Sequence, residues 1–452
     1  MKSKMNYKLK RDMGLFQATL YGVGIIIGAG IYVLIGIGSG IAGNAVWLSF
    51  LVAAFIATFT ALSYAELSSM FPKEAAEFVY TRNAFRKKSF AFVISWTLLI
   101  TGIIAGATVA LGFGGYFVHL TGIGSPFVVA IGLILVMSVI NYVGIEKVAK
   151  FNDVAAMSEI VGLIIIIVAG LYVFSISGVS VDFFAMPNDF SLIGIMTATS
   201  VIFFAYIGFE EIANISEEIK NPKKTLPKAL ILSIVISTIL YILVTVSAVA
   251  AVGWEKLSTS AAPLSETLSA IWGPYAGLFI SIFALLATSN TVLITMVTMS
   301  RVLYGMGCQG SIHEVCSRVG RYGTPYVSVG IVAVLSILAL FIGGIGFIAK
   351  LTDIGIFVVY IAVNLSLIKL RFSEPKTKRP FKSPLNIGKI PLLAIFGVLA
   401  CGFMLVLFEP ILLLYEAIIM AAGYVVYRVY KDVEKYEEKS KLKKNKTRAL
   451  LS

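Results

Sequence analysis

Two apolar segments of the chain contain glycines that an uninterrupted helix does not need. The first segment, residues 22–32, has four glycines, and each costs about 1 kcal/mol relative to alanine in a helix interior. Gly24 and Gly28 suit a small-residue face that lets a neighbouring helix approach closely. A helix that breaks near residues 28–30 would instead free backbone amides and carbonyls to bind a ligand.

The second segment, residues 203–211, favours the broken helix. Two adjacent carboxylates, Glu210 and Glu211, lie just past Gly208. Gly208 itself comes 180 residues and five apolar segments after Gly28. Interrupted helices at matching positions in two halves of a chain are typical of transporters whose inverted repeats hold a site near the membrane midplane. Irregular backbone at that depth is stable only where protein buries it or where it lines a cavity.

The polarity of such breaks predicts the ligand. The N-terminal end of a half-helix presents unpaired N–H groups and the positive end of its dipole, which attract a carboxylate. The C-terminal end of the other half presents carbonyl groups, which suit an ammonium group. A site with both ends is complementary to a zwitterionic amino acid, and it leaves no unpaired ion in the membrane when it is empty.

The elements that must position these breaks are membrane-spanning helices. Of 452 residues, 58% are hydrophobic and 13% charged, which excludes a soluble enzyme, a secreted disulfide scaffold and a disordered nucleic-acid tail. We predict an all-α integral membrane protein with twelve transmembrane helices, each long enough to cross or nearly cross a bilayer. The segments are residues 14–40, 44–69, 90–118, 125–145, 151–175, 190–214, 227–252, 272–304, 326–344, 347–370, 389–407 and 410–428.

The basic residues alternate between the two sides of these segments. The net charge is +13, and 35 of the 37 Lys and Arg residues fall at the termini or in every second loop, the exceptions being Lys256 and Lys350. By the positive-inside rule both termini are cytoplasmic, and we expect the protein in the cell membrane. The basic tail is therefore interpreted as a topological and lipid-binding signal, with no nucleic-acid partner.

Side chains that support enzymatic or metal chemistry are scarce. His119 and His313 are isolated, and the three cysteines lack the spacing of a metal site. The sequence contains no nucleotide-binding loop, zinc-protease pair or nucleophile elbow. We expect no enzyme activity, no catalytic residue, no bound metal and no cofactor.

Six motifs resemble the amino acid–polyamine–organocation transporter family, in particular prokaryotic broad-specificity and cationic amino acid transporters. They are residues 28–32, 64–72, 203–210, 217–227, 300–304 and 323–325. The resemblance implies a leucine-transporter-like fold with a 5+5 inverted repeat, two appended helices and alternating access around a central site. It divides the chain into an N-terminus (1–13), a transport core (14–370, with repeats at about 14–175 and 190–370), helices 11 and 12 (371–428) and a basic tail (429–452).

The resemblance also implies the substrate-binding residues. The amides of Ala29 and Gly30 would take the substrate carboxylate, and the carbonyls of Ile26, Phe204 and Ile207 would take the amino group. Phe204 would form an aromatic lid. Relatives often have Ser or Thr where this chain has Ala29, so a hydroxyl contact is missing while the amide remains. The whole predicted site is Gly24, Ile26, Gly28, Ala29, Gly30, Phe204, Ala205, Ile207 and Gly208.

Glu159 is the predicted coupling residue, and Glu210 is a protonation-sensitive residue beside the second break. By its distance from the run 150–152, Glu159 stands where many proton-coupled relatives have lysine, beside the sodium position of sodium-coupled members. Burial favours a neutral carboxyl group, so Glu159 could carry a proton. Kept ionised, it could attract Na⁺, with Thr288 and Ser289 as hydroxyl ligands. A hydrogen-bonded structural acid is the third interpretation.

Other charged residues near the spans have simpler explanations. Lys350 and Asp353 are expected to pair on one helix. Glu66 is expected to be solvated or to cap its helix. Glu416 lies outside the repeat core and is expected to face an oligomer contact or a polar neighbour.

The sequence as a whole predicts a secondary active amino-acid transporter, with proton-coupled uptake favoured. The alternatives are a sodium-coupled symporter and an exchanger of cationic amino acids or polyamines, which would need Glu159 and Glu211 to face the cavity. A non-transporting nutrient sensor would differ by lacking saturable flux. The expected partners are an amino-acid substrate and the lipid bilayer. Neither the amino acid nor the choice between monomer and homodimer follows from the sequence.

Overall fold

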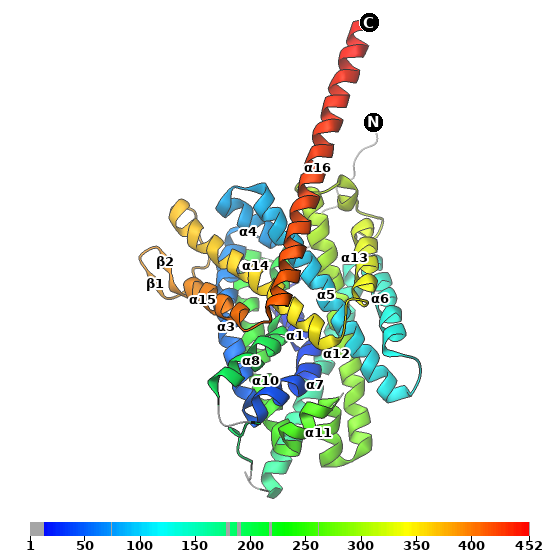
Figure 1. Ribbon diagram of the computed structural model, residues 1–452, viewed down its shortest axis with the longest axis vertical. Coiled ribbons are helices and arrows are strands. Elements are labelled where there is room, and N and C mark those ends of the chain that lie inside the picture. The colour runs from blue at the N-terminus through cyan, green and yellow to red at the C-terminus, as the bar shows by residue number, and fades with distance from the viewer. Residues whose placement is uncertain are drawn as a thin grey trace.

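The structure is a computed structural model that describes residues 13–73, 75–177, 181–187, 191–216, 219–260 and 262–451 (Figure 1). Most of the expected N-terminal segment lies outside the described residues, and so do Glu217 and Glu218 of the fourth motif.

The described elements are helices joined by short connections and one small antiparallel ribbon. The α-helices are α1 (Leu15–Ala29), α2 (Ile35–Ala42), α3 (Val46–Met70), α4 (Ala76–Phe85), α5 (Lys88–Thr121), α6 (Pro126–Val143), α7 (Ile145–Ser177), α8 (Leu192–Ile202), α9 (Glu211–Asn214), α10 (Pro222–Thr259), α11 (Pro263–Trp272), α12 (Pro274–Cys308), α13 (Tyr326–Ala339), α14 (Ile345–Ser373), α15 (Leu392–Val406) and α16 (Pro410–Leu451). The shorter elements are η1 (Gly30–Leu34), η2 (Gly43–Ala45), η3 (Phe203–Tyr206), η5 (Glu314–Ser317), β1 (Asn386–Ile387) and β2 (Ile390–Pro391).

Many of these helices can cross a membrane. Among the described residues, nine helical stretches are long and apolar enough to do so by length and composition, and one of them, Leu15–Met70, runs from α1 through α3. Two further apolar helices, α13 and α15, are shorter. The protein is therefore an all-helical membrane protein, as its composition predicted, while the division into twelve spans stays a prediction.

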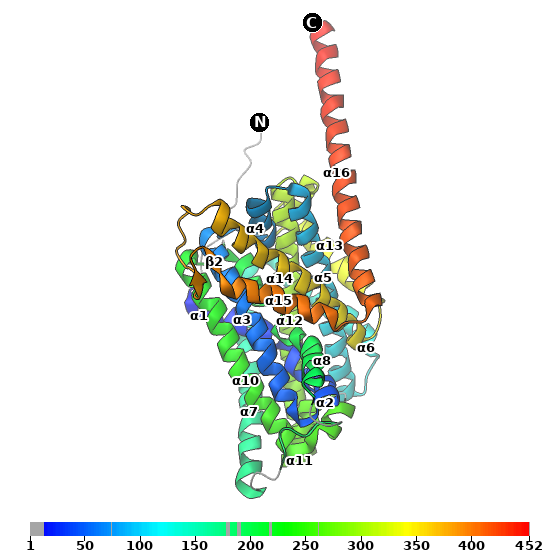
Figure 2. The same ribbon diagram turned by 60° about the vertical axis from the view of Figure 1, so that its left-hand side comes forward.

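The helices pack into one elongated bundle. α10 lies along α3, α12 lies along α5, and α1 packs against α7, α10 and α12. Figures 1 and 2 show α4 and the far end of α16 toward one end of the bundle and α11 toward the other. The charge pattern likewise put the α4 segment and the tail on one side of the membrane. Which side faces the cytoplasm stays a prediction.

Two short helices, α4 and α11, occupy connections that the sequence analysis treated as loops. Each has ten residues, which is too few to cross a bilayer, so neither produces the long apolar segment that indicates a spanning helix. α11 begins at Pro263, where the missing N–H of proline has no cost. α4 is tied to the second broken helix by Asn214, whose Oδ1 accepts the Ala76 N–H at 2.8 Å.

Glu66 is fully buried at the end of α3, so the expectation of a solvated or helix-capping residue is wrong. Its Oε2 lies 2.5 Å from Nη2 of Arg371, and its Oε1 lies 3.0 Å from Nε of Arg379. The Ser383 N–H donates to Oε2 at 2.8 Å. These contacts join α3 to the end of α14 and to the loop that follows it.

The expected pair of Lys350 and Asp353 does not form. Lys350 instead binds Glu409, just before α16, with its Nζ 3.1 Å from Oε1. Asp353 is turned into the bundle, fully buried, and neither of its oxygens has a hydrogen-bond partner among the described residues. The partner of Lys350 is thus set by how the chain returns after α15 rather than by spacing along one helix.

Candidate functional site

The first predicted break is present at Gly28. Its φ of −5° and ψ of −137° are not helical, and the chain continues as a π-helix, η1, before α2 begins. A Cβ on Gly28 would lie 1.8 Å from Oγ1 of Thr291 on α12. Glycine is needed at this position because α12 approaches the backbone closely.

The second predicted break is present between α8 and α9. The helix tightens into η3, Ile207 is extended with φ −63° and ψ 140°, and Gly208 has a φ of +117°. Only glycine adopts this φ readily, since a side chain there would be strained. The helix resumes at Glu211 as α9. The prediction of two interrupted segments is therefore confirmed.

The two breaks contact each other directly. A Cβ on Gly30 would lie 2.4 Å from Cα of Ala205, so backbone packs on backbone. The hydroxyl of Tyr241, on α10, donates to the carbonyl of Ile26 and lies 2.9 Å from the carbonyl of Ala205. Tyr241 was not predicted as a site residue from the sequence. The only available signal was its position in an apolar span, where a buried phenol hydroxyl needs a hydrogen-bond partner.

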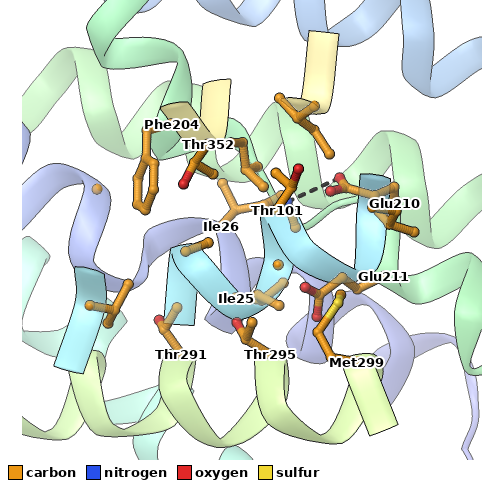
Figure 3. Close-up of a pocket in the computed structure, with 18 residues that line it drawn as sticks. Ile25, Ile26, Thr101, Phe204, Glu210, Glu211, Thr291, Thr295, Met299 and Thr352 are labelled. Carbon is orange, nitrogen blue, oxygen red and sulfur yellow. Dashed lines mark hydrogen bonds between the residues drawn. The ribbon is translucent and has the colours of Figure 1, made fainter. Parts of the chain in front are cut away.

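A pocket lies beside the two breaks (Figure 3). Five of the predicted substrate-binding residues line it, namely Ile26, Gly30, Phe204, Ile207 and Gly208. Three others, Gly24, Gly28 and Ala205, are not among the described lining residues, and the side chain of Ala29 lies outside what the structure describes. The structure thus brings backbone from both half-helices to one small space.

Three helices supply pocket side chains that the sequence analysis did not place there. In Figure 3, Thr291 and Thr295 of α12 lie across the pocket from Phe204 and Thr352. The threonines on α12 recur four residues apart, as residues on one helix face do, and this spacing was the available signal. The contributions of the three helices are Leu98, Thr101, Gly102, Ala105 and Val109 from α5, Thr291, Thr295 and Met299 from α12, and Thr352 and Ile356 from α14.

Two carboxylates, those of Glu210 and Glu211, also line the pocket. Oε2 of Glu210 accepts the Tyr360 hydroxyl at 2.7 Å and the Gly208 N–H at 3.0 Å. Oε2 of Glu211 accepts the Thr298 hydroxyl at 2.7 Å. Because these donors are neutral, the two acids give the pocket a capacity to attract positive charge.

Glu159 is fully buried and is not among the described residues that line the pocket. Its Oε1 accepts a hydrogen bond at 3.2 Å from Nδ2 of Asn290, which also donates to Oδ1 of Asn152 at 3.2 Å. The network touches α1, since a Cβ on Gly24 would lie 3.1 Å from Asn290 Nδ2. Gly24 is about one turn before the break at Gly28, so the network lies against the helix that carries that break.

Thr288 and Ser289, the predicted hydroxyl ligands for a cation, donate within their own helix. The Thr288 hydroxyl bonds the Ala284 carbonyl at 2.7 Å, and the Ser289 hydroxyl bonds the Leu286 carbonyl at 2.8 Å. The described hydrogen-bond partner of Glu159 is Asn290, which comes next on α12 and which the sequence analysis did not single out.

Glu77 connects the second broken helix to α4. Its Oε1 accepts the Tyr64 hydroxyl at 2.9 Å, and Nδ2 of Asn214 lies 3.2 Å from both of its oxygens. Burial raises the pKa of Glu77 from 4.5 to about 7, against the lowering effect of these hydrogen bonds. Three elements, α3, α4 and α9, therefore meet at one carboxyl group.

An all-helical membrane protein in which two broken helices meet at a pocket has the architecture of a membrane transporter rather than of an enzyme. The family model described as "Amino acid permease" matches residues 13–414. The chain belongs to this family, within the amino acid–polyamine–organocation superfamily, so the resemblance drawn from the motifs is confirmed.

Similar proteins agree with this assignment. The chain is 30% identical over 444 residues to the branched-chain amino acid permease BcaP of Bacillus subtilis, covering 93% of each chain. It is 27% identical over 443 residues to the methylthioribose transporter of the same organism, covering 93% of this chain and 94% of the relative. It is 30% identical over 395 residues to cationic amino acid transporter 4 of Mus musculus, covering 82% and 61%.

Proposed function

We propose that this protein is a secondary active transporter that carries amino acids across the cell membrane by alternating access. The observation that carries the proposal is the contact between the two breaks at the pocket, where Gly30 packs on Ala205. Backbone groups of opposite polarity at one place suit the carboxylate and the ammonium group of a zwitterion. Family membership supports amino acids as the substrate class.

In this proposal the amides of Ala29 and Gly30 bind the substrate carboxylate. The carbonyls of Ile26, Phe204 and Ile207 bind the amino group, and the Phe204 ring covers the site. The carbonyl of Ile26 already accepts one hydrogen bond from Tyr241, and its second lone pair leaves room for the substrate. Tyr241 would then hold both breaks in register while the substrate is absent.

The moving parts in this proposal are two inverted repeats, at about 14–175 and 190–370, with residues 371–428 appended and both termini in the cytoplasm. The positions of the breaks support it, since each falls in the first long apolar segment of its half. The placement of α4 and of the end of α16 toward one end of the bundle supports the alternation of loops.

We assign proton coupling to Glu159. The acid is fully buried, Oε1 has a neutral partner, and Oε2 has no hydrogen-bond partner among the described residues. A carboxyl group in such surroundings is stable when neutral and must find a cation when ionised. Because the network contacts Gly24, a change of charge at Glu159 would act on the helix that carries the first break.

A sodium ion is the alternative at the same place. Oε2 of Glu159 and Oδ1 of Asn290 both lack a hydrogen-bond partner among the described residues, and oxygen atoms are the ligands that hard cations prefer. A third possibility, exchange of cationic amino acids, is supported by the position of Glu211 at the pocket. Glu159 gives that possibility no support, because it is not among the described lining residues.

The test is uptake of radiolabelled leucine into sodium-free proteoliposomes with an imposed inward proton gradient. We expect the wild type to accumulate leucine. In Glu159→Gln we expect gradient-driven accumulation to fall at least tenfold while leucine exchange continues. Glu255→Gln, which changes an exposed acid on α10, is the control and should accumulate leucine as the wild type does. Full accumulation by Glu159→Gln would refute the assignment, and a requirement for a sodium gradient would support the alternative ion.

The substrate is best found by thermal-shift measurements on the purified protein. A ligand at 100 times its dissociation constant adds about 2.7 kcal/mol to the unfolding free energy. Leucine, lysine, a polyamine and methylthioribose cover the chemistry suggested by the similar proteins. Stabilisation by an amino acid is expected, and stabilisation by methylthioribose alone would overturn amino-acid transport.

A further inference from the structure

Two buried oxygen atoms near the first break have no hydrogen-bond partner among the described residues. One is Oε2 of Glu159 on α7, and the other is the hydroxyl oxygen of Tyr32 on η1, four residues after Gly28. Both residues are fully buried. Buried polar groups in native proteins ordinarily have a partner, so two partnerless oxygens in one region need an explanation.

The two groups lie against the same face of α7. Gly162 comes three residues after Glu159, and residues at this spacing are neighbours on the surface of a helix. A Cβ on Gly162 would lie 3.0 Å from the hydroxyl oxygen of Tyr32. The phenol of Tyr32 and the carboxyl group of Glu159 also interact electrostatically. The missing side chain of Gly162 thus lets the phenol approach α7 within a turn of the carboxyl group.

The other groups around Glu159 leave Oε2 to Tyr32. Asn290 donates to Oε1, and no cationic side chain pairs with either oxygen among the described residues. Two titratable side chains face the acid from packed elements, Tyr32 on η1 and Tyr241 on α10. The hydroxyl of Tyr241 already lies at the carbonyls of the two breaks. Tyr32 is held only through its backbone, where its carbonyl accepts the Tyr116 hydroxyl at 2.9 Å.

We propose that Tyr32 is a positioning residue for coupling, whose hydroxyl donates a hydrogen bond to Oε2 of Glu159 when that acid is ionised. The inference rests on the proposed function, in which Glu159 carries the coupling proton. In the neutral acid the proton lies on Oε2, because Oε1 accepts from Asn290, and the phenol faces an uncharged group. The bond to the ionised acid is charge-assisted, which makes it about twice as strong.

This bond acts on both sides of the first break. Before the break α1 packs on Asn290 at Gly24, whereas Tyr32 lies after the break, on the π-helix that begins at Gly30. When Glu159 loses its proton to water on the side of lower proton concentration, the hydroxyl moves to Oε2 and draws η1 toward α7. When a proton returns, η1 is released. The charge of the acid is thereby joined to the backbone that holds the substrate carboxylate in the proposed function.

The experiment measures leucine uptake into proteoliposomes as the external pH is varied at a fixed pH difference across the membrane, with leucine exchange followed in parallel. Tyr32→Phe removes only the hydroxyl group. Without this donor the ionised acid is less stable, so Glu159 keeps its proton to a higher pH. We expect the pH of half-maximal uptake to rise by about one to two units, the range for a hydrogen bond to a charged group, while exchange continues.

Combining Tyr32→Phe with Glu159→Gln tests whether the tyrosine acts through the acid. If it does, Tyr32→Phe changes neither the remaining leucine exchange nor its pH dependence in the Glu159→Gln background, so the two effects are not additive. A purely structural role would add the same loss in both backgrounds. Tyr172→Phe, which changes an exposed tyrosine on α7, is the matched control and should keep the wild-type half-maximal pH.

Folding is checked by thermal unfolding, and Tyr32→Phe should unfold no earlier than the wild type because the hydroxyl it removes has no described partner. The inference is overturned if this variant keeps the wild-type half-maximal pH, or if its effect is equally large in the Glu159→Gln background. Failure of the proposed function gives a different result, since Glu159→Gln alone would then accumulate leucine as the wild type does. That result removes the role of Tyr32 as well.

Discussion

Buried carboxylates occupy two regions of this protein in different electrostatic surroundings. Toward the α4 end, Glu66 has a guanidinium group against each oxygen, from Arg371 and Arg379. In the middle of the bundle, Glu159 and Glu210 are equally buried, but their described hydrogen-bond partners are neutral amides, hydroxyls and a backbone N–H. In the first region the carboxylate charge is balanced by two guanidinium groups. In the second region the acids, whose described partners are neutral, can still gain or lose a proton or bind a cation.

This difference separates acids that stabilise the fold from acids that can take part in transport. An acid that is fully paired with cations fixes the helices that supply those cations, and it has no reason to titrate or to exchange partners. An acid with only neutral partners is sensitive to protons, ions and charged substrates, which is what a transport site requires. Glu77 belongs to the second case by its partners, which are both neutral, and it links the broken helix to α4.

The largest effect should follow from breaking the paired region. Glu66→Gln leaves Arg371 and Arg379 buried without a counter-charge, so we expect a loss of about 3–5 kcal/mol in unfolding free energy. Thermal or denaturant unfolding in detergent measures it. Glu266→Gln, which removes an exposed pair with Lys256, is the control and should cost about 0–1 kcal/mol. Equal losses in the two variants would contradict the distinction.

The titration of Glu77 should be visible in the pH dependence of stability. Because burial raises the pKa of Glu77 from 4.5 to about 7, the folded protein binds more protons than the unfolded chain between these values. The contribution of Glu77 to stability is therefore full below pH 4.5 and is lost as pH rises to about 7, by about 3 kcal/mol in all. Glu77→Gln should flatten the stability curve over this window. An unchanged difference between pH 5 and pH 8 in the variant would contradict the assignment.

The smallest effect concerns the contact that brings the two breaks together. Gly30→Ala puts a Cβ 2.4 Å from the backbone of Ala205, so the breaks must separate at a cost of about 1–3 kcal/mol. We expect a comparable loss in leucine binding energy, about ten- to one-hundredfold in affinity. Gly132→Ala, on α6 with nothing within 4 Å of the added Cβ, should leave leucine affinity unchanged. Wild-type affinity in Gly30→Ala would place the substrate elsewhere.

The sequence predicted the parts of the site that depend on local chemistry. Four glycines indicated the first break, Gly208 and the two carboxylates after it indicated the second, and Ile26, Gly30 and Gly208 do line the pocket. The walls from α5, α12 and α14 were missed because a residue such as Ala105 has the same hydropathy whether it faces lipid, another helix or a pocket. Tyr241 was missed because its role depends on two carbonyls that its own neighbours in the chain do not reveal.

By itself, the sequence determined that the chain is an all-helical membrane protein interrupted at two places, since apolar excess and glycine position act over a few residues. Only the tertiary structure decided which buried acids are paired with cations and which are not. Glu66 meets Arg371, 305 residues later, while Glu416 meets the bare backbone of Gly355. Such contacts depend on which helix faces pack together, and hydropathy cannot distinguish those faces because most of the residues on all of them are apolar.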